Sequence, residues 1–359
     1  MKNLISFIVL LCLFATSSFS QREIDLKSAV GNKQEIKLSE IAKSIRYIPL
    51  ETREECLLNT DLKVYYGEEY LFVLDEKEPG NFYRFTKEGK FLNKIGQVGE
   101  GPKEYIRSLT FMVNEDKKEF IIVDFQGAEF VVYSYEGAFI RRMKFPENTF
   151  VMNAATLWNG NLVYANNNFY RSNRNYELFL ADVQTGKVKE RVLSTVPGDY
   201  KIRILLTPPL LYTYQGEVYY KNPLKNVICV LRGGLKQYRK YVLNVGAVDN
   251  KNRDDYFNPQ KNKDALDILG IHETDSFLMF FYGYQGDAHW MIYSKQDWAG
   301  RVAVCQDKFG FVDDLSGSDQ PFAPRSYYSL SNRHLVDIHP DEAGDNNPVI
   351  VVAELKGIN

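Results

Sequence analysis

The residues of this sequence that could bind a ligand or carry out acid–base chemistry include aspartates at the ends of apolar segments. Asp75 ends Tyr70–Asp75, Asp124 ends Phe120–Asp124, and Asp182 ends a third such segment. Carboxylates gathered near one mouth of a channel could hold a cation or act as acid and base. The structural alternative, which we favour, is a turn in which the carboxylate accepts hydrogen bonds from backbone N–H groups. Asp75 and Asp124 are kept as candidate ligand-binding residues.

Aromatic and polar side chains also gather between positions 282 and 298. Sugars stack on aromatic faces, so this group could recognise a glycan, although aromatic rings are equally the ordinary filling of a β-protein core. Trp290 lies in an apolar segment and is expected in the core, whereas Tyr284 lies between two glycines and is expected on a loop. Arg325 follows Pro321–Pro324 and could guard the same mouth. The candidate ligand-binding residues are therefore Tyr284, His289, Trp298, Arg325, Asp75 and Asp124.

The stretch from Gly96 to Tyr105 has glycines in a spacing that resembles a phosphate-binding loop. A phosphate loop would need a helix at its end and a Gly-Lys-Ser/Thr sequence, and neither is present here. We therefore interpret it as a tight connection between two β units, with Glu104 and Tyr105 as anchors to a neighbouring unit. Its structural residues are Gly96, Gly99, Gly101, Pro102, Glu104 and Tyr105.

Other chemical motifs are missing from the sequence. The four histidines are widely spaced and never four residues apart, the cysteines form no Cys-x-x-Cys pair, and Gly-x-Ser-x-Gly does not occur. Neither a zinc site nor a serine hydrolase is therefore indicated, and we predict no metal and no cofactor.

The elements that must position these residues are short β-strands in a repeated order. An apolar strand ending in Asp, a turn, an aromatic strand, a Gly turn and a third strand occur at Tyr70–Ile95 and again at Phe120–Phe145. Leu71 and Ile121 are equivalent positions 50 residues apart. Repeats of this length in short strands are typical of propellers.

Six such units can be counted, the last of which contains Tyr327–Leu330, His334–Ile338 and Pro348–Leu355. We predict an all-β fold, a β-propeller of six four-stranded blades, because radial stacking buries both faces of each small sheet. Ile45–Leu50 is the candidate strand that closes the ring. Five or seven blades, or two β-sandwiches, remain open alternatives.

The first 20 residues have the pattern of a secretory signal: the basic residue Lys2, an apolar run from Leu4 to Ala15, and small residues at Ser18 and Ser20. We expect residues 1–20 to be a signal peptide, 21–44 an N-terminal extension and 45–359 a single propeller domain. The protein is then exported, periplasmic or extracellular, without a transmembrane segment. Lipid attachment at Cys12 is less favoured, because that residue lies inside the apolar run.

The charge of the chain bears on its partners, and its cysteines bear on its core. The net charge is −2 and no basic run exceeds two residues, which argues against a nucleic-acid partner. The cysteines outside the signal, Cys56, Cys229 and Cys305, are interpreted as small buried residues. We expect a monomer.

Several stretches resemble those of a six-bladed β-propeller family of exported bacterial proteins, many of which have no known function. The matching stretches are Ile45–Leu50, Gly96–Tyr105, Phe311–Gly317 and Asn347–Leu355. Lys103 and Ser316 depart from residues that are common in the family. The resemblance implies a fold and a location in the cell envelope, and it implies no activity.

The sequence therefore supports a ligand- or protein-binding scaffold in the bacterial cell envelope, with no readable catalytic motif. The alternative is a glycan hydrolase or lyase that uses carboxylates at the channel mouth, which would require a converging pair of carboxyl groups. A third hypothesis is a structural partner of another envelope protein, which would present an exposed apolar patch. These hypotheses predict a glycan or an envelope protein as the partner.

Overall fold

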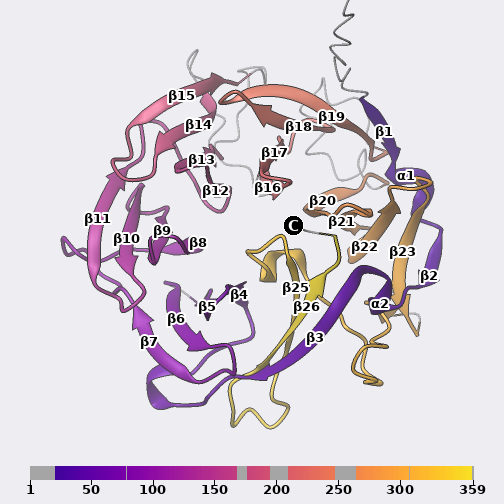
Figure 1. Ribbon diagram of the computed structural model, residues 1–359, viewed down its shortest axis with the longest axis horizontal. Coiled ribbons are helices and arrows are strands. Elements are labelled where there is room, and N and C mark those ends of the chain that lie inside the picture. Colours follow the sequence, from indigo (N-terminus) through magenta and orange to yellow (C-terminus); the bar gives the residue numbers. More distant parts are fainter. Residues whose placement is uncertain are drawn as a thin grey trace, which may run out of the picture.

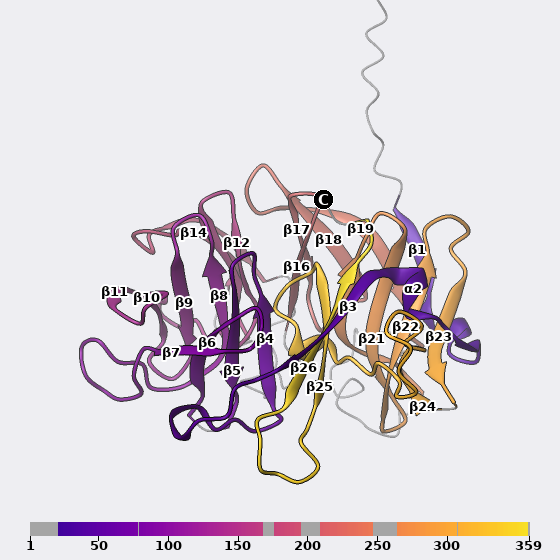
Figure 2. The ribbon, with the colours of Figure 1, turned by 60° about the horizontal axis from the view of Figure 1, so that its bottom comes forward.

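The computed structural model describes residues 21–77, 79–167, 176–194, 209–246, 264–306 and 308–357. Their strands form six sheets around a central axis, so the fold is a six-bladed β-propeller, as predicted (Figure 1). Figure 2 shows the same ring from another side. The predicted signal peptide, residues 1–20, lies outside the described residues.

The first three blades are antiparallel four-stranded sheets, with the first strand of each nearest the axis and the fourth at the rim (Figure 1). Within each blade, apolar residues face both neighbouring blades, which is why the middle strands are almost wholly buried. The strands are β4 (Leu62–Tyr66), β5 (Tyr70–Asp75), β6 (Asn81–Thr86) and β7 (Phe91–Ile95); β8 (Ser108–Asn114), β9 (Glu119–Asp124), β10 (Glu129–Ser134) and β11 (Phe139–Lys144); and β12 (Ala155–Trp158), β13 (Asn161–Ala165), β14 (Tyr176–Asp182) and β15 (Val188–Leu193).

Blades four and five repeat this plan and add a further strand at the rim. The strands of blade four are β16 (Leu210–Tyr214), β17 (Glu217–Lys221), β18 (Val227–Arg232) and β19 (Lys236–Asn244). Those of blade five are β20 (Asp267–Glu273), β21 (Phe277–Tyr284), β22 (Asp287–Ser294) and β23 (Gly300–Cys305), and β24 (Lys308–Phe309) pairs with β23.

The added rim strands come from residues 22–49, which we call the N-terminal strap. Its first strand, β1 (Arg22–Asp25), pairs in parallel with β19, and β2 (Lys33–Glu35) pairs in parallel with β23. Two short helices, α1 (Leu26–Ala29) and α2 (Leu38–Ile41), connect the strap strands, and no described helix is long and apolar enough to span a membrane. The strap therefore covers the outer edges of blades four and five before it reaches blade six.

Blade six closes the ring with strands from both ends of the chain, as predicted. Its three paired strands are β25 (His334–His339), β26 (Val349–Leu355) and the strap strand β3 (Ala42–Pro49), which is antiparallel to β26. The predicted strand at Tyr327–Leu330 is wrong in part, because Ser326–Tyr328 forms the 3-10 helix η2. The hydroxyl of Ser329 donates to the backbone carbonyls of Ser331 and His334, which bends this segment away from a regular strand.

Each of the six interfaces between neighbouring blades contains an apolar cluster. Between blades one and two, Phe82 contacts Tyr105 and Phe111 with their rings at steep angles, the favoured edge-to-face arrangement. Trp290, expected in the core, is fully buried between blades five and six. The aromatic content of the sequence is therefore used chiefly to join blades.

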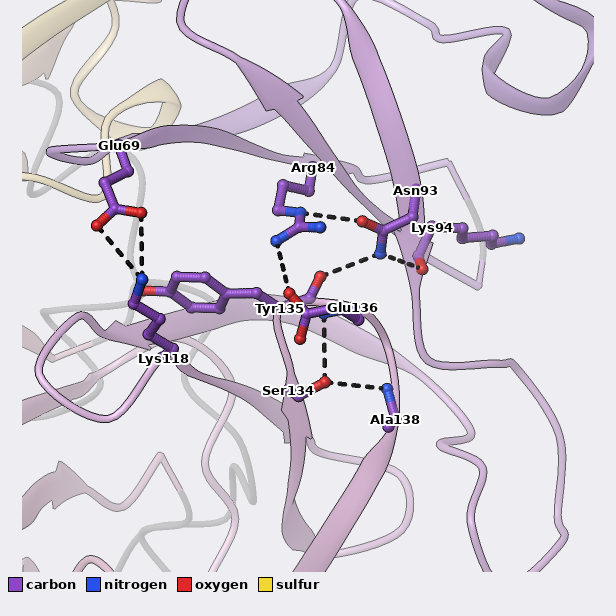
Figure 3. A network of polar contacts seen from close by, with 9 residues as sticks. All are labelled: Glu69, Arg84, Asn93, Lys94, Lys118, Ser134, Tyr135, Glu136 and Ala138. Atoms are coloured by element: carbon purple, nitrogen blue, oxygen red, sulfur yellow. Dashed lines mark hydrogen bonds and ion pairs between the residues drawn. The ribbon is translucent and has the colours of Figure 1, made fainter.

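Polar contacts reinforce the same joints. Arg84 of blade one donates to Glu136 of blade two at 3.1 Å and to the side-chain oxygen of Asn93 at 2.9 Å (Figure 3). The amide of Asn93 in turn donates to the backbone carbonyl of Tyr135 at 3.1 Å. The guanidinium of Arg84 also lies 4.7 Å from the ring of Tyr70. Blades one and two are thus joined by a continuous polar network.

Gly89, in the turn between β6 and β7, lies directly against the strap strand β3. Its φ is +86°, and a Cβ atom there would lie 2.1 Å from the carbonyl oxygen of Pro49 in β3. Gly160 has a similar φ of +72° but no atom within 4 Å of such a Cβ. We expect Gly160→Ala to cost about 1 kcal/mol of unfolding free energy, the cost of a left-handed conformation. Gly89→Ala should cost at least about 2 kcal/mol, because the backbone of β3 must also move.

Urea unfolding of both variants measures this difference. Equal losses of unfolding free energy would mean that the turn at Gly89 moves freely away from the closing strand.

Candidate functional site

The glycine loop from Gly96 to Tyr105 satisfies its own polar groups. The carboxylate of Glu104 accepts a hydrogen bond from the backbone N–H of Gly101 at 2.8 Å. The buried Tyr105 hydroxyl donates to the carbonyl of Gly80 at 2.9 Å, and Gly96 has a φ of +68°. Pro102 is exposed, and a Cβ at Gly99 would overlap the Glu104 carboxylate. The anchoring groups therefore hold the loop in place, as predicted for a tight connection between two β units.

Asp75 and Asp124 are buried and bonded to the backbone. Asp75 accepts from the backbone N–H groups of Asn59 and Lys77 at 3.2 and 3.0 Å. Asp124 accepts from the N–H groups of Ile106, Arg107 and Gly127 at 2.8, 3.1 and 2.9 Å. Both carboxylates therefore hold loops at the ends of their strands.

The strap contacts the two aromatic candidates on the rim side of blade five. The ammonium of Lys27 lies 4.6 Å from the centre of the Tyr284 ring and donates to its hydroxyl at 3.1 Å. The guanidinium of Arg22 lies 4.2 Å from the centre of the Trp298 ring. Each aromatic ring thus already makes a cation–π contact with a side chain of the strap, so that face of the ring is covered.

The two remaining candidates lie on different elements, His289 on β22 opposite Tyr282 and Arg325 just before η2. His289 is half-buried on β22, and burial, with Lys33 nearby, lowers the pKa of its imidazole. Arg325 is exposed and donates to the hydroxyl of Tyr327 at 2.7 Å. The structure does not bring the six candidate ligand-binding residues together.

A cavity of about 750 Å³ lies at the centre of the ring, and none of those six residues lines it. Every blade contributes to its wall, because the first strand of each blade runs beside the axis (Figure 1). The lining combines aromatic, aliphatic, hydroxyl and charged side chains. It includes Arg46, Lys63, Tyr65, Tyr66, Glu68, Lys87, Thr110, Phe111, Met112, Glu115, Thr156, Leu211, Tyr212, Thr213, Tyr214, Ile271, His272, Tyr327, Leu330, Asn332, Arg333, His334 and Glu354.

Residues 326–333, the inner segment, form one wall of this cavity. The side-chain amide of Asn332 donates to the backbone carbonyl and hydroxyl oxygens of Thr213 in blade four, both at 2.8 Å. The backbone N–H of Leu330 donates to the carbonyl of Val64 in blade one at 2.9 Å. The inner segment is therefore fixed at both sides, and the cavity wall is formed before any ligand arrives.

Two buried histidines lie in the wall. Burial lowers the pKa of His272 to about 4, and its ring lies edge-on to Trp290 at 5.5 Å. Burial also lowers the pKa of His334 to about 4, and this ring packs edge-on against Tyr66 at 5.0 Å. Both imidazoles are therefore neutral near pH 7. Sequence reasoning missed them because only the fold brings positions 272 and 334 to one cavity.

A buried carboxylate lies directly behind the wall. Glu273 of blade five accepts hydrogen bonds from the hydroxyls of Tyr212 and Tyr241 in blade four at 2.8 and 2.7 Å. The ammonium of Lys295 lies 2.8 Å from the same carboxylate. Burial, and then the charge of Glu273, raises the pKa of both tyrosines, so they remain neutral donors. This cluster positions Tyr212 at the cavity.

In the described ranges, no three His, Cys, Asp or Glu side chains are placed to hold a metal ion. Among the lining carboxylates, burial alone would raise the pKa of Glu354, but hydrogen bonds and charge from Lys43 lower it. That lowering is opposite to what a general acid at neutral pH needs.

Solved structures share this fold across nearly the whole chain. A Bacteroides fragilis protein that is thought to be exported aligns with a TM-score of 0.66 and 15% identity, over 93% of this chain and 99% of that one. A member of the DUF4221 family from Bacteroides vulgatus aligns with a TM-score of 0.52 and 12% identity, over 90% and 99%. At such identities the likeness shows the fold alone. No curated protein sequence matches, and the family model described as "Domain of unknown function (DUF4934)" matches residues 21–354.

Proposed function

Because the chain belongs to the DUF4934 family, whose function is unknown, we propose from its geometry that it is an exported propeller that binds a small solute in the central cavity without converting it. The observation that carries this proposal is the cavity of about 750 Å³ lined by all six blades. Pockets for small molecules are typically 300–1,000 Å³ in volume, mostly preformed, and furnished with a few polar groups. Export is supported by the signal-like start of the sequence.

The cavity wall favours binding over hydrolysis. A glycan hydrolase needs two carboxyl groups that face one bond, with one of them protonated near neutral pH. Asp75 and Asp124 do not line the cavity. Of the carboxylates that do, Glu354 pairs with Lys43 and has a lowered pKa, and Glu115 accepts from the backbone N–H of Glu68. Tyr65, Tyr212 and Asn332 instead offer aromatic faces and hydrogen-bonding groups to a bound molecule.

A thermal-shift screen of the purified protein tests the proposal. The panel contains neutral sugars, sugar acids, sugar phosphates, amino acids, short peptides and divalent cations. A solute at 100 times its Kd stabilises the folded state by about 2.7 kcal/mol, which raises the melting temperature measurably. We expect at least one hit, and we expect Thr156→Trp, which fills the cavity from β12, to abolish it.

The matched control is Thr60→Trp, because Thr60 is exposed and does not line the cavity. This variant should respond to the same solutes as the unchanged protein. A panel without hits, or hits that persist in Thr156→Trp, would contradict binding in the cavity.

A further inference from the structure

Positive side chains gather at one mouth of the cavity, where blade six meets blade one. The strand register places His334, Glu354 and Ser44 side by side across blade six. Arg333 precedes His334, and Arg46 lies two residues beyond Ser44 on the same face of β3. Arg46, Lys87, Arg333, His334 and Glu354 all line the cavity. The mouth thus holds three cations, which we call the cationic mouth: Arg46, Lys87 and Arg333.

One carboxylate that lines the same mouth, Glu354, is already engaged. Glu354 pairs with Lys43 at 2.8 Å. Lys87 donates to the backbone carbonyls of Gly67 and Glu68 at 2.8 and 3.3 Å and lies 3.8 Å from the centre of the Tyr66 ring. Within the described residues, the guanidinium groups of Arg46 and Arg333 make no hydrogen bond or ion pair, and both side chains are exposed. Two planar cations therefore remain available at the edge of the cavity.

His334 follows Arg333 in the chain, and its ring packs against Tyr66, over which Lys87 lies. Burial is the main reason that the pKa of its imidazole is low, and Glu354 opposes that effect. Lys87, Arg333 and Lys43 each lower that pKa further. Because His334 is neutral near pH 7, it adds no charge and can offer a ring nitrogen to a bound molecule.

We propose, on the basis of the binding function proposed above, that the cationic mouth recognises a single oxyanion, a carboxylate or a phosphate, on the solute that fills the cavity. Guanidinium groups match both oxyanions because their N–H donors lie in one plane and can bond two oxygens at once. Glu68 and Glu115 line the same cavity, and the Glu115 carboxylate accepts from the backbone N–H of Glu68 at 2.8 Å. These carboxylates repel a polyanion, so a solute with one acidic group and several hydroxyl groups fits best.

Three matched sugars test the proposal by calorimetry at fixed ionic strength. Glucuronate differs from glucose in a carboxylate, and glucose 1-phosphate differs from it in a phosphate. We expect at least one acidic sugar to bind tenfold or more tightly than glucose, roughly the gain from a charge-assisted hydrogen-bonded pair. Tighter glucuronate identifies a carboxylate ligand, and tighter glucose 1-phosphate identifies a phosphate ligand; either outcome supports the oxyanion.

Variants separate the mouth from the rest of the cavity. Arg333→Gln and Arg46→Gln should each weaken binding of the acidic sugar about tenfold, and by more than they weaken binding of glucose. Arg53→Gln is the control, since Arg53 is exposed, pairs with Glu51 and does not line the cavity. Equal binding of all three sugars, or loss of binding in Arg53→Gln alone, would overturn the oxyanion and leave the cavity function standing. If no sugar binds while other solutes do, the oxyanion inference also fails. A protein that binds nothing in the wider screen would overturn both proposals.

Discussion

Replacing Glu273 by alanine is expected to lower the free energy of unfolding by about 3–5 kcal/mol, the loss typical of breaking a buried ion pair by removing one partner. The Glu273 side chain is fully buried, whereas that of Lys295 is 15% exposed. Without the carboxylate, the Lys295 ammonium and the hydroxyls of Tyr212 and Tyr241 remain in the interior with no acceptor. The loss should be large because these donors come from two blades and share one acceptor.

Urea unfolding at pH 7 measures this loss, and two further variants define its origin. Tyr212→Phe removes one donor and leaves the ion pair, so it should cost only about 1–2 kcal/mol. Glu69→Ala breaks the pair with Lys118, in which both side chains are more than half exposed, and should cost about 0–1 kcal/mol. A loss below about 1 kcal/mol in Glu273→Ala would show that water or another acceptor replaces the carboxylate.

Acidification should destabilise the protein through the two cavity histidines. An unfolded histidine has a pKa near 6.5, and the pKa values of His272 and His334 are about 4 in the folded state. Between pH 6.5 and 4 the folded state therefore binds fewer protons than the unfolded state. The stability that the neutral histidines contribute is fully present above pH 6.5 and is lost as the pH falls towards 4. At pH 4.5 each histidine should account for a loss of about 2.5 kcal/mol relative to pH 7.

The readout is the difference between urea-unfolding free energies at pH 7 and pH 4.5. Carboxyl groups also titrate in this range, so the variant is compared with the unchanged protein at both values. His272→Gln should reduce the pH-dependent loss by about 2.5 kcal/mol, whatever its stability at pH 7. An unchanged loss would mean that the imidazole of His272 is protonated in the folded state near pH 4.5 without cost.

Local signals in the sequence were sufficient to predict the blades. The units at Tyr70–Ile95 and Phe120–Phe145 are recognised because short apolar runs and glycine turns recur within a few residues of each other. The closing strand at Ile45–Leu50 was predicted for the same reason, and it forms most of β3. In contrast, β2 has the sequence Lys-Gln-Glu with all three side chains exposed, so it pairs through its backbone and has no hydrophobic pattern to detect.

The candidate site was harder to predict because it depends on contacts between distant positions. Tyr284 and Trp298 look like a free aromatic platform in sequence, but Lys27 and Arg22, more than 250 residues earlier, lie over their rings. Arg46 and Arg333 reach one mouth only through the register of blade six. A single sequence contains no signal for such long-range contacts, because the charge or aromaticity of a residue does not determine which other side chain covers it.

The strap also determines the order in which the chain can fold. Its strands β1, β2 and β3 are synthesised first, but their partners β19, β23 and β26 all lie beyond residue 235, and Ile48 pairs with Ile350. Contacts so distant in sequence are slow to form, because the intervening chain must first be ordered. The ring cannot close until residues 349–355 have been synthesised and can pair with β3. A chain that is still being synthesised therefore has an open ring.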